Sequence, residues 1–239
     1  MQADQLQQAI AFCQRQPVAR ILALDALERG TARVLGMEPG ALLLYDSQLD
    51  GNMLCWDNEA AARRLLTQLP ASDMLTLEHV TLEDQARAQF GFTGGMHCHT
   101  CARLSREPVP VDTPMELRLL AESDYDMVWA YYQQLDEKGV RTALAEGRLF
   151  GGFLTGGPDA GRMVGFIGIH SEGALGLLHV FESFRRRGMA YALEGLMINR
   201  QLARGLRVFG QVVVGNETSL RLHRRLGYTI ADAPSVWLW

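Results

Sequence analysis

The chain has 239 residues, of which 48% are hydrophobic and 21% charged, and its formal net charge is -4 at pH 7. This length predicts one or two domains with a sizeable core, and the composition excludes a disordered or fibrous protein. The acidic balance argues against nucleic acid as a partner, because binding to phosphates needs a basic face. No stretch approaches eighteen apolar residues and the N-terminus lacks a signal-peptide core, so we expect a cytoplasmic protein with no membrane partner.

Residues 1–106 predict a small α/β domain. ALLLYD and NMLCW are typical of short strands, and NEAAARRLLTQL of a helix that Asn58 caps. A strand, a helix and a last strand follow, in MLTLEHV, TLEDQARAQF and GMHCHTCARLS. This half has no arginine-glycine turn that leads into a helix, so we expect no anion site in it.

The segment HCHTC within the last of these strands contains a CxxC and two histidines, which is a reason to consider zinc. On a strand, His97, His99 and Cys101 share one face, whereas Cys98 points to the other. No second CxxC completes a site. We therefore predict no metal, and we expect the four scattered cysteines to be reduced thiols.

Residues 107–114 predict a linker, because three prolines between Arg106 and Pro114 interrupt any regular pattern. Residues 115–239 then predict a second α/β (α+β) domain in the order β, helices, β, β, β, α, β, α, β. Its expected elements are strand MELRLLAES, helix SDYDMVWAYYQQL capped by Ser123, a shorter helix in DEKGVRTALAEG, strands RLFGGFLTG, GRMVGFIGIH and ALGLLHVF, helix 187–203, strand RVFGQVVV, helix 216–226 and strand SVWLW.

The segment FRRRGMAYALEGLM carries the strongest chemical signal. A strand stops, Arg185, Arg186, Arg187 and Gly188 follow, and an apolar-periodic helix begins. Such a turn directs several backbone N–H groups to one point, and the helix dipole adds roughly half a positive charge there. Gly188 lets the turn come close to a bulky diphosphate. Three arginines at a helix start oppose its dipole, which favours a bound anion over a solvated turn.

RRRGMA resembles the motif with which GNAT acyltransferases hold the pyrophosphate of coenzyme A, and Arg185, Gly188 and Ala190 fill its three specified places. VVVGNETSLRLHRRLGY is similar to the last motif of that superfamily, with matches at Asn216, Ser219, Leu226, Gly227 and Tyr228. The resemblance covers about half the chain, from the linker to Trp239. Because its N-terminal half looks like a degenerate copy of the second half, the chain resembles most the glycine-N-acyltransferase-like branch.

The resemblance implies a GNAT-type mixed, mostly antiparallel sheet flanked by helices. It also implies that acetyl-CoA or another acyl-CoA is the co-substrate and that a small primary amine or amino acid attacks it directly. Coenzyme contacts would come from the main chain at Val180, whose strand offers one N–H to the thioester oxygen, and from Arg185, Arg186, Arg187, Gly188, Met189, Ala190, Asn216 and Ser219. A homodimer is a further hypothesis.

The position of the glutamate base of many relatives falls on Ala174, which accepts no proton. Glu172, on the same face if the strand extends to it, and His179 are the candidates for a base. His223 stands where many relatives carry a tyrosine as leaving-group acid. Each of the three residues also has a purely structural interpretation: Glu172 as a turn residue, His179 as a half-buried strand histidine and His223 as a packing group. The absence of the glutamate favours an α-amine as the acceptor, because such an amine is already partly neutral at pH 7. The same absence equally fits a non-catalytic coenzyme A-binding sensor or scaffold.

Overall fold

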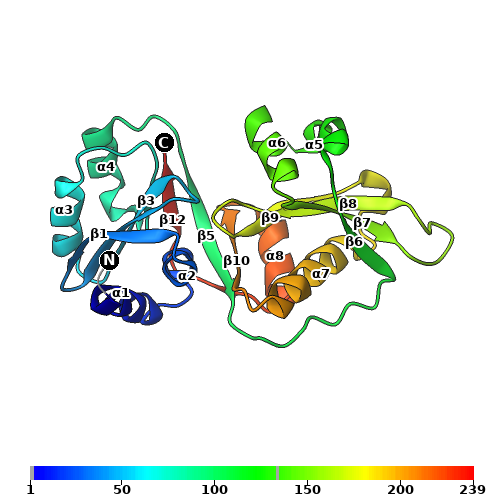
Figure 1. Ribbon diagram of the computed structural model, residues 1–239, viewed down its shortest axis with the longest axis horizontal. Coiled ribbons are helices and arrows are strands. Elements are labelled where there is room, and N and C mark those ends of the chain that lie inside the picture. The colour runs from blue at the N-terminus through cyan, green and yellow to red at the C-terminus, as the bar shows by residue number, and fades with distance from the viewer. Residues whose placement is uncertain (1–2, 133–134) are drawn as a thin grey trace. The chain divides into compact units, whose positions relative to one another are not determined.

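The computed structural model describes residues 3–132 and 135–239 (Figure 1). The chain forms two compact units, and each contains segments that are distant in the sequence. Unit 1 consists of Met1–Ala102, Gln211–Arg221 and Tyr228–Trp239, and unit 2 consists of Arg103–Gly210 and Leu222–Gly227. In the described part of the chain, no helix has the length and apolar character that crossing a membrane requires.

Unit 1 is built on a large mixed sheet whose strands run in the order β1-β2-β3-β4-β12-β5-β10, with β11 paired to β5. Leucines of β2 and β3 and the apolar face of α3 form its main core. Its elements are α1 (Ala3–Gln14), α2 (Ile21–Arg29), β1 (Ala32–Glu38), β2 (Ala41–Asp46), β3 (Gly51–Trp56), α3 (Glu59–Gln68), β4 (Leu75–Leu77), η1 (Val80–Leu82), α4 (Glu83–Phe90), β5 (Gly95–Arg103), β11 (Thr229–Ile230) and β12 (Ser235–Leu238).

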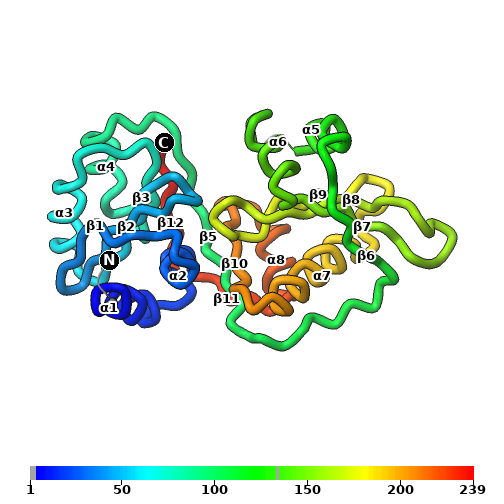
Figure 2. Tube along the Cα trace, viewed as in Figure 1, coloured from blue at the N-terminus to red at the C-terminus, as the bar shows by residue number. Residues whose placement is uncertain are grey.

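The last strand of the chain lies inside the sheet of unit 1. The sequence predicts SVWLW as part of a domain over residues 115–239, whereas β12 pairs antiparallel with both β4 and β5. Figure 2 shows β12 beside β5. Val236 and Leu238 are fully buried there. The pairing follows from the open edges of β4 and β5, which β12 satisfies with hydrogen bonds on both sides.

Unit 2 contains an antiparallel meander in the order β6-β7-β8-β9. Helices α5 and α6 lie on one side of this sheet and α7 on the other (Figure 1). Its elements are β6 (Met115–Leu119), η2 (Glu122–Asp124), α5 (Tyr125–Tyr131), α6 (Glu137–Ala145), β7 (Leu149–Leu154), β8 (Met163–Ile169), β9 (Leu175–Val180), η3 (Glu182–Phe184) and α7 (Met189–Ala203); β10 (Val208–Val213) and α8 (Glu217–Arg225) belong partly to each unit.

The predicted fold class is confirmed: helices flank mixed, mostly antiparallel sheets. The helix predicted from Ser123 begins only at Tyr125, because Glu122–Asp124 form a 3-10 turn in which Asp124 accepts a hydrogen bond from the N–H of Ala121. Gln133 and Gln134, at the end of that predicted helix, lie outside the described residues. The linker lies along α7, because Asn199 donates to and accepts from the backbone of Val109.

Candidate functional site

The N-terminus of α7 is open to solvent. Gly188, its N-cap residue, has a left-handed φ of 79°, and no side chain of the described residues caps the helix. Its carbonyl accepts the hydrogen bond from Ala192 that closes the first turn. The remaining N–H groups of the first turn therefore point to solvent with the positive end of the helix dipole, which is the arrangement that binds phosphate groups.

The three arginines before this helix have different surroundings. Arg185 donates from Nε to the carbonyl of Val180, at 3.0 Å, which ties the turn to the end of β9. Arg187 forms an ion pair with Asp159 at 3.3 Å. Arg186 is exposed and has a left-handed φ of 58°. Arg185 and Arg186 thus add positive charge beside the open helix end, whereas the charge of Arg187 is partly balanced.

Strand β9 leads into this turn and contains a β-bulge. Phe166 pairs with His179 and Gly168 with Gly176, so two residues of β9, Leu177 and Leu178, oppose a single residue of β8. Leu177 has a φ of 50°, a left-handed conformation that is strained for leucine. Bulges and strained residues of this kind are frequent beside functional sites because they redirect backbone groups. β9 is also the last strand of its sheet.

Tyr132, at the end of α5, contacts the bulge. The backbone N–H of Leu177 donates to its hydroxyl, and burial raises the pKa of that hydroxyl to about 12. Tyr132 is therefore a neutral hydroxyl at physiological pH. No sequence motif marks this residue, because the contact depends on the register of β8 and β9.

His179 on β9 lies within a group of aromatic rings. Its ring centroid is 4.8 Å from that of Tyr131, 5.6 Å from Phe166 and 5.9 Å from Phe181. Nε2 is buried and has no hydrogen-bond partner among the described residues. Burial, and secondly the positive charge of Arg185, lower the pKa of His179. The imidazole is therefore neutral near pH 7, which is the form that accepts a proton.

The other predicted base, Glu172, is not on β9. It lies in the turn between β8 and β9, where the N–H of His170 donates to the carbonyl of Ala174. The expectation that it shares a strand face with Ala174 is wrong, because the left-handed Gly173 separates them. Glu172 is 7% exposed, and its negative charge contributes to the raised pKa of the Tyr132 hydroxyl. Ala174 is completely buried.

His223 on α8 is buried against α7. Its Nε2 lies 3.6 Å from Oε1 of Glu194, and the two side chains are 9% and 4% exposed. Glu194 was not among the residues singled out from the sequence. Its signal is a lone acidic residue in the apolar run MAYALEGLMIN, where the helical period places it toward the core.

Asn216 and Ser219 belong to unit 1, so the structure does not place them with the α7 turn in one unit. The side chain of Asn216 accepts from the N–H of Ser219 at 3.1 Å and caps the start of α8. Met189 is buried and Ala190 partly buried at the beginning of α7. In unit 2 the structure thus brings together Val180, the turn residues 185–190 and His179.

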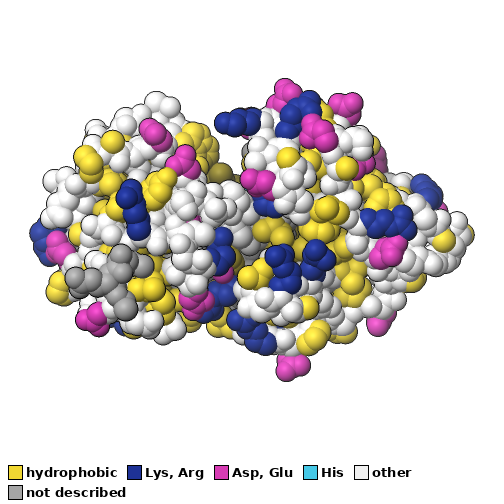
Figure 3. All heavy atoms as spheres, in the orientation of Figure 1, with side chains coloured by type: hydrophobic (Ala, Val, Ile, Leu, Met, Phe, Trp, Pro, Cys, Tyr) yellow, Lys and Arg dark blue, Asp and Glu magenta, His cyan; other side chains and the backbone are white. Residues whose placement is uncertain are grey.

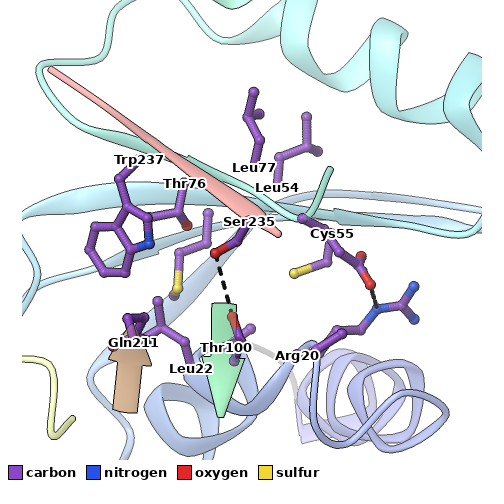
Figure 4. Close-up of a pocket in the computed structure, with 14 residues that line it drawn as sticks. Arg20, Leu22, Leu54, Cys55, Thr76, Leu77, Thr100, Gln211, Ser235 and Trp237 are labelled. Atoms are coloured by element: carbon purple, nitrogen blue, oxygen red, sulfur yellow. Dashed lines mark hydrogen bonds and ion pairs between the residues drawn. The ribbon is translucent and has the colours of Figure 1, made fainter. Parts of the chain in front are cut away.

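Unit 1 also contains a strand, a turn and a helix in succession, β3 and α3, but the N-terminus of α3 is capped. Asn58 caps α3 by accepting from Ala61, and Glu59 adds a negative charge in the first turn. The preceding β3 pairs with parallel β4 over Asn52–Leu54. The cavity on this sheet has a volume of about 30 Å³, enough for water only (Figure 4). Arg20 at its edge is already bound to Glu78.

On the face drawn in Figure 3, basic and acidic side chains are interspersed. In the described residues, no group of three or more His, Cys, Asp and Glu side chains is placed to hold a metal ion. His97 of the HCHTC segment is instead bound to Glu83, at 2.7 Å.

Comparison with known proteins identifies the fold. A family model described as FR47-like protein matches residues 151–238. A Drosophila protein is similar over 100% of this chain and 96% of its own, with a TM-score of 0.61 and 15% identity. A GCN5-related N-acetyltransferase-like protein from Streptococcus suis covers 100% of both chains, with a TM-score of 0.55 and 16% identity.

A third solved structure, a putative acetyltransferase from the GNAT family of Novosphingobium aromaticivorans, covers 93% of this chain and 95% of its own, with a TM-score of 0.51 and 17% identity. No curated protein gives a significant match. The chain therefore has the fold of GNAT acetyltransferases.

Proposed function

We propose that the protein is an acyl-CoA-dependent N-acyltransferase and that unit 2 binds the coenzyme. The observation that carries this proposal is the uncapped N-terminus of α7, with Gly188 in a left-handed conformation and Arg185 and Arg186 beside it. A diphosphate fits this end, because backbone N–H groups and positive charge meet where no side chain fills the space. The match of the FR47-like family model to residues 151–238 supports the same assignment.

The residues of unit 2 supply the groups that acyl transfer needs. Neutral His179 accepts the proton of the attacking amine, and a backbone N–H at the bulge of β9 stabilises the oxyanion. His223 donates a proton to the departing thiolate. The coenzyme brings an activated thioester, and the amine attacks it directly.

Unit 1 is, in this proposal, a degenerate copy of the same architecture. One feature supports the loss of its coenzyme site: the Asn58 side chain caps α3. The acidic Glu59 further disfavours an anion at this helix end. These features agree with a glycine-N-acyltransferase-like arrangement, in which only the second half is active.

The acceptor in this proposal is a small molecule with a primary amine, such as an amino acid, and the acyl group is acetyl or another short acyl. An α-amino group is partly neutral at pH 7, so a histidine with a lowered pKa is a sufficient base. The solved structures described as acetyltransferases support acetyl as the first acyl group to test.

The test is calorimetric titration with coenzyme A, followed by thiol release from acetyl-CoA in the presence of a panel of small amines. We expect binding and amine-dependent thiol release. The buried Ala174 favours one alternative, a non-catalytic coenzyme A-binding protein, since no carboxylate occupies that position. Binding without thiol release for any amine would support that alternative, and no binding would reject both.

A further inference from the structure

A buried acid–base pair connects α7 and α8 in unit 2. Glu194 and His223 lie 3.6 Å apart, and both side chains are more than nine-tenths buried. The neighbours of Glu194 on α7 are apolar, and Leu193 and Met197 are fully buried. A carboxylate at such a position stays ionised only with a positive partner, because the interior solvates charge poorly. The imidazole of His223 faces Glu194 at this position.

The pair lies beside the strands of the proposed coenzyme site. A Cβ atom added to Gly210 of β10 would be 3.5 Å from Nε2 of His223 and 2.8 Å from the carbonyl oxygen of Leu175, the first residue of β9. The imidazole is thus packed against the backbone of β10 where this strand approaches β9. Strand β9 continues from Leu175 to Val180, which holds Arg185 of the open turn.

The groups around His223 make Glu194 its charged neighbour. From α7 the imidazole faces Glu194, and from β10 it faces the backbone of Gly210. Arg224 and Arg225 on α8 itself are exposed, and Arg225 lies over the ring of Tyr191.

Stability is a weak reason for such a pair. Burying two ionic groups costs desolvation energy that their attraction only partly offsets, so apolar residues of similar volume often serve a core equally well. Buried titratable pairs next to a site are, by contrast, a common means of setting an acid for catalysis.

We propose that Glu194 is a positioning residue that holds the imidazole of His223 in place as the leaving-group acid. The proposal rests on the proposed acyl transfer. As the amine nitrogen bonds to the thioester carbon, the C–S bond breaks and its electron pair stays on sulfur. His223 then gives its proton to that sulfur, which yields the thiol and a neutral imidazole. The proton lost by the amine passes through His179 to solvent, and His223 recovers one from solvent.

The experiment uses the variants Glu194→Gln, Glu194→Asp, His223→Gln and the double variant Glu194→Gln/His223→Gln. Glu146→Gln, an exposed acid paired with Arg148, is the matched control. NMR follows the ring signals of His223 in the intact protein, without any ligand. Steady-state kinetics with acetyl-CoA and the best amine of the panel give kcat and KM, and chemical denaturation verifies that each variant is folded.

In Glu194→Gln we expect the ring signals of His223 to move away from their wild-type chemical shifts, and in Glu194→Asp to stay close to them, because only aspartate keeps a carboxylate beside the ring. We expect kcat to fall roughly tenfold or more in Glu194→Gln, with KM for acetyl-CoA unchanged. The double variant should be no slower than His223→Gln, because Glu194 acts through His223.

Unchanged ring signals of His223 in folded Glu194→Gln would overturn the coupling, and so would a double variant whose loss of kcat is the product of the two single losses. A wild-type protein that binds no coenzyme A and releases no thiol would instead reject the proposed function and, with it, the acid role. The NMR spectra would then still decide whether Glu194 positions the ring of His223.

Discussion

Replacing Gly188 with valine tests the open helix end most sharply. A Cβ atom at position 188 meets no protein atom within 4 Å, so valine causes no clash in the free protein. The φ of 79° is left-handed, however, and a side chain in that conformation costs about 1–2 kcal/mol of folding free energy. In the complex, the valine side chain would also occupy the space that a diphosphate needs.

Gly205→Val provides the matched control, because Gly205 has a φ of 73°, follows the other end of α7 and is equally unobstructed. Both variants should lose about 1–2 kcal/mol in chemical denaturation. Only Gly188→Val should lose coenzyme A binding in calorimetric titration. If folded Gly188→Val binds coenzyme A as tightly as Gly205→Val, the α7 turn is not the anion site.

Three further predictions concern single residues or segments. Arg185→Ala should weaken coenzyme A binding about tenfold in calorimetry, or about 1.4 kcal/mol, since the N–H groups of the helix remain; a loss as great as that of Gly188→Val would contradict a backbone-centred site. The pKa of His179 is lowered and the base must be neutral, so kcat/KM should fall only as pH drops below the ordinary histidine range. His179→Gln should abolish this fall at low pH, and a fall that persists in the variant would exclude His179 as the base. Purified protein should contain no stoichiometric zinc and keep its Tm with a chelator, whereas a fall in Tm on chelation would show that HCHTC binds metal.

The α7 turn could be predicted because all of its signals are local. Three arginines, Gly188 and the start of an apolar helix are adjacent in the sequence, and the structure keeps them in one turn. The partner of Arg187 could not be predicted, because Asp159 is 28 positions away and reaches the turn through the loop between β7 and β8.

Features that depend on strand register or on pairing between distant segments could not be predicted from the sequence. The bulge at Leu177 exists only when β8 and β9 are aligned, and nothing in ALGLLHVF indicates a left-handed leucine. β12 joins unit 1 because two strands there need a partner, which a reading in chain order does not reveal. The contact between Glu194 and His223 could not be predicted, because it exists only when α8 packs against α7.

A crystal structure of the protein with coenzyme A would test the proposed coenzyme site at α7. We predict pyrophosphate oxygens within hydrogen-bond distance of the backbone N–H groups at the start of α7, with the pantetheine arm along β9 and no coenzyme in unit 1. A pyrophosphate bound at α3 of unit 1, or anywhere away from the turn between Arg185 and Ala190, would contradict it.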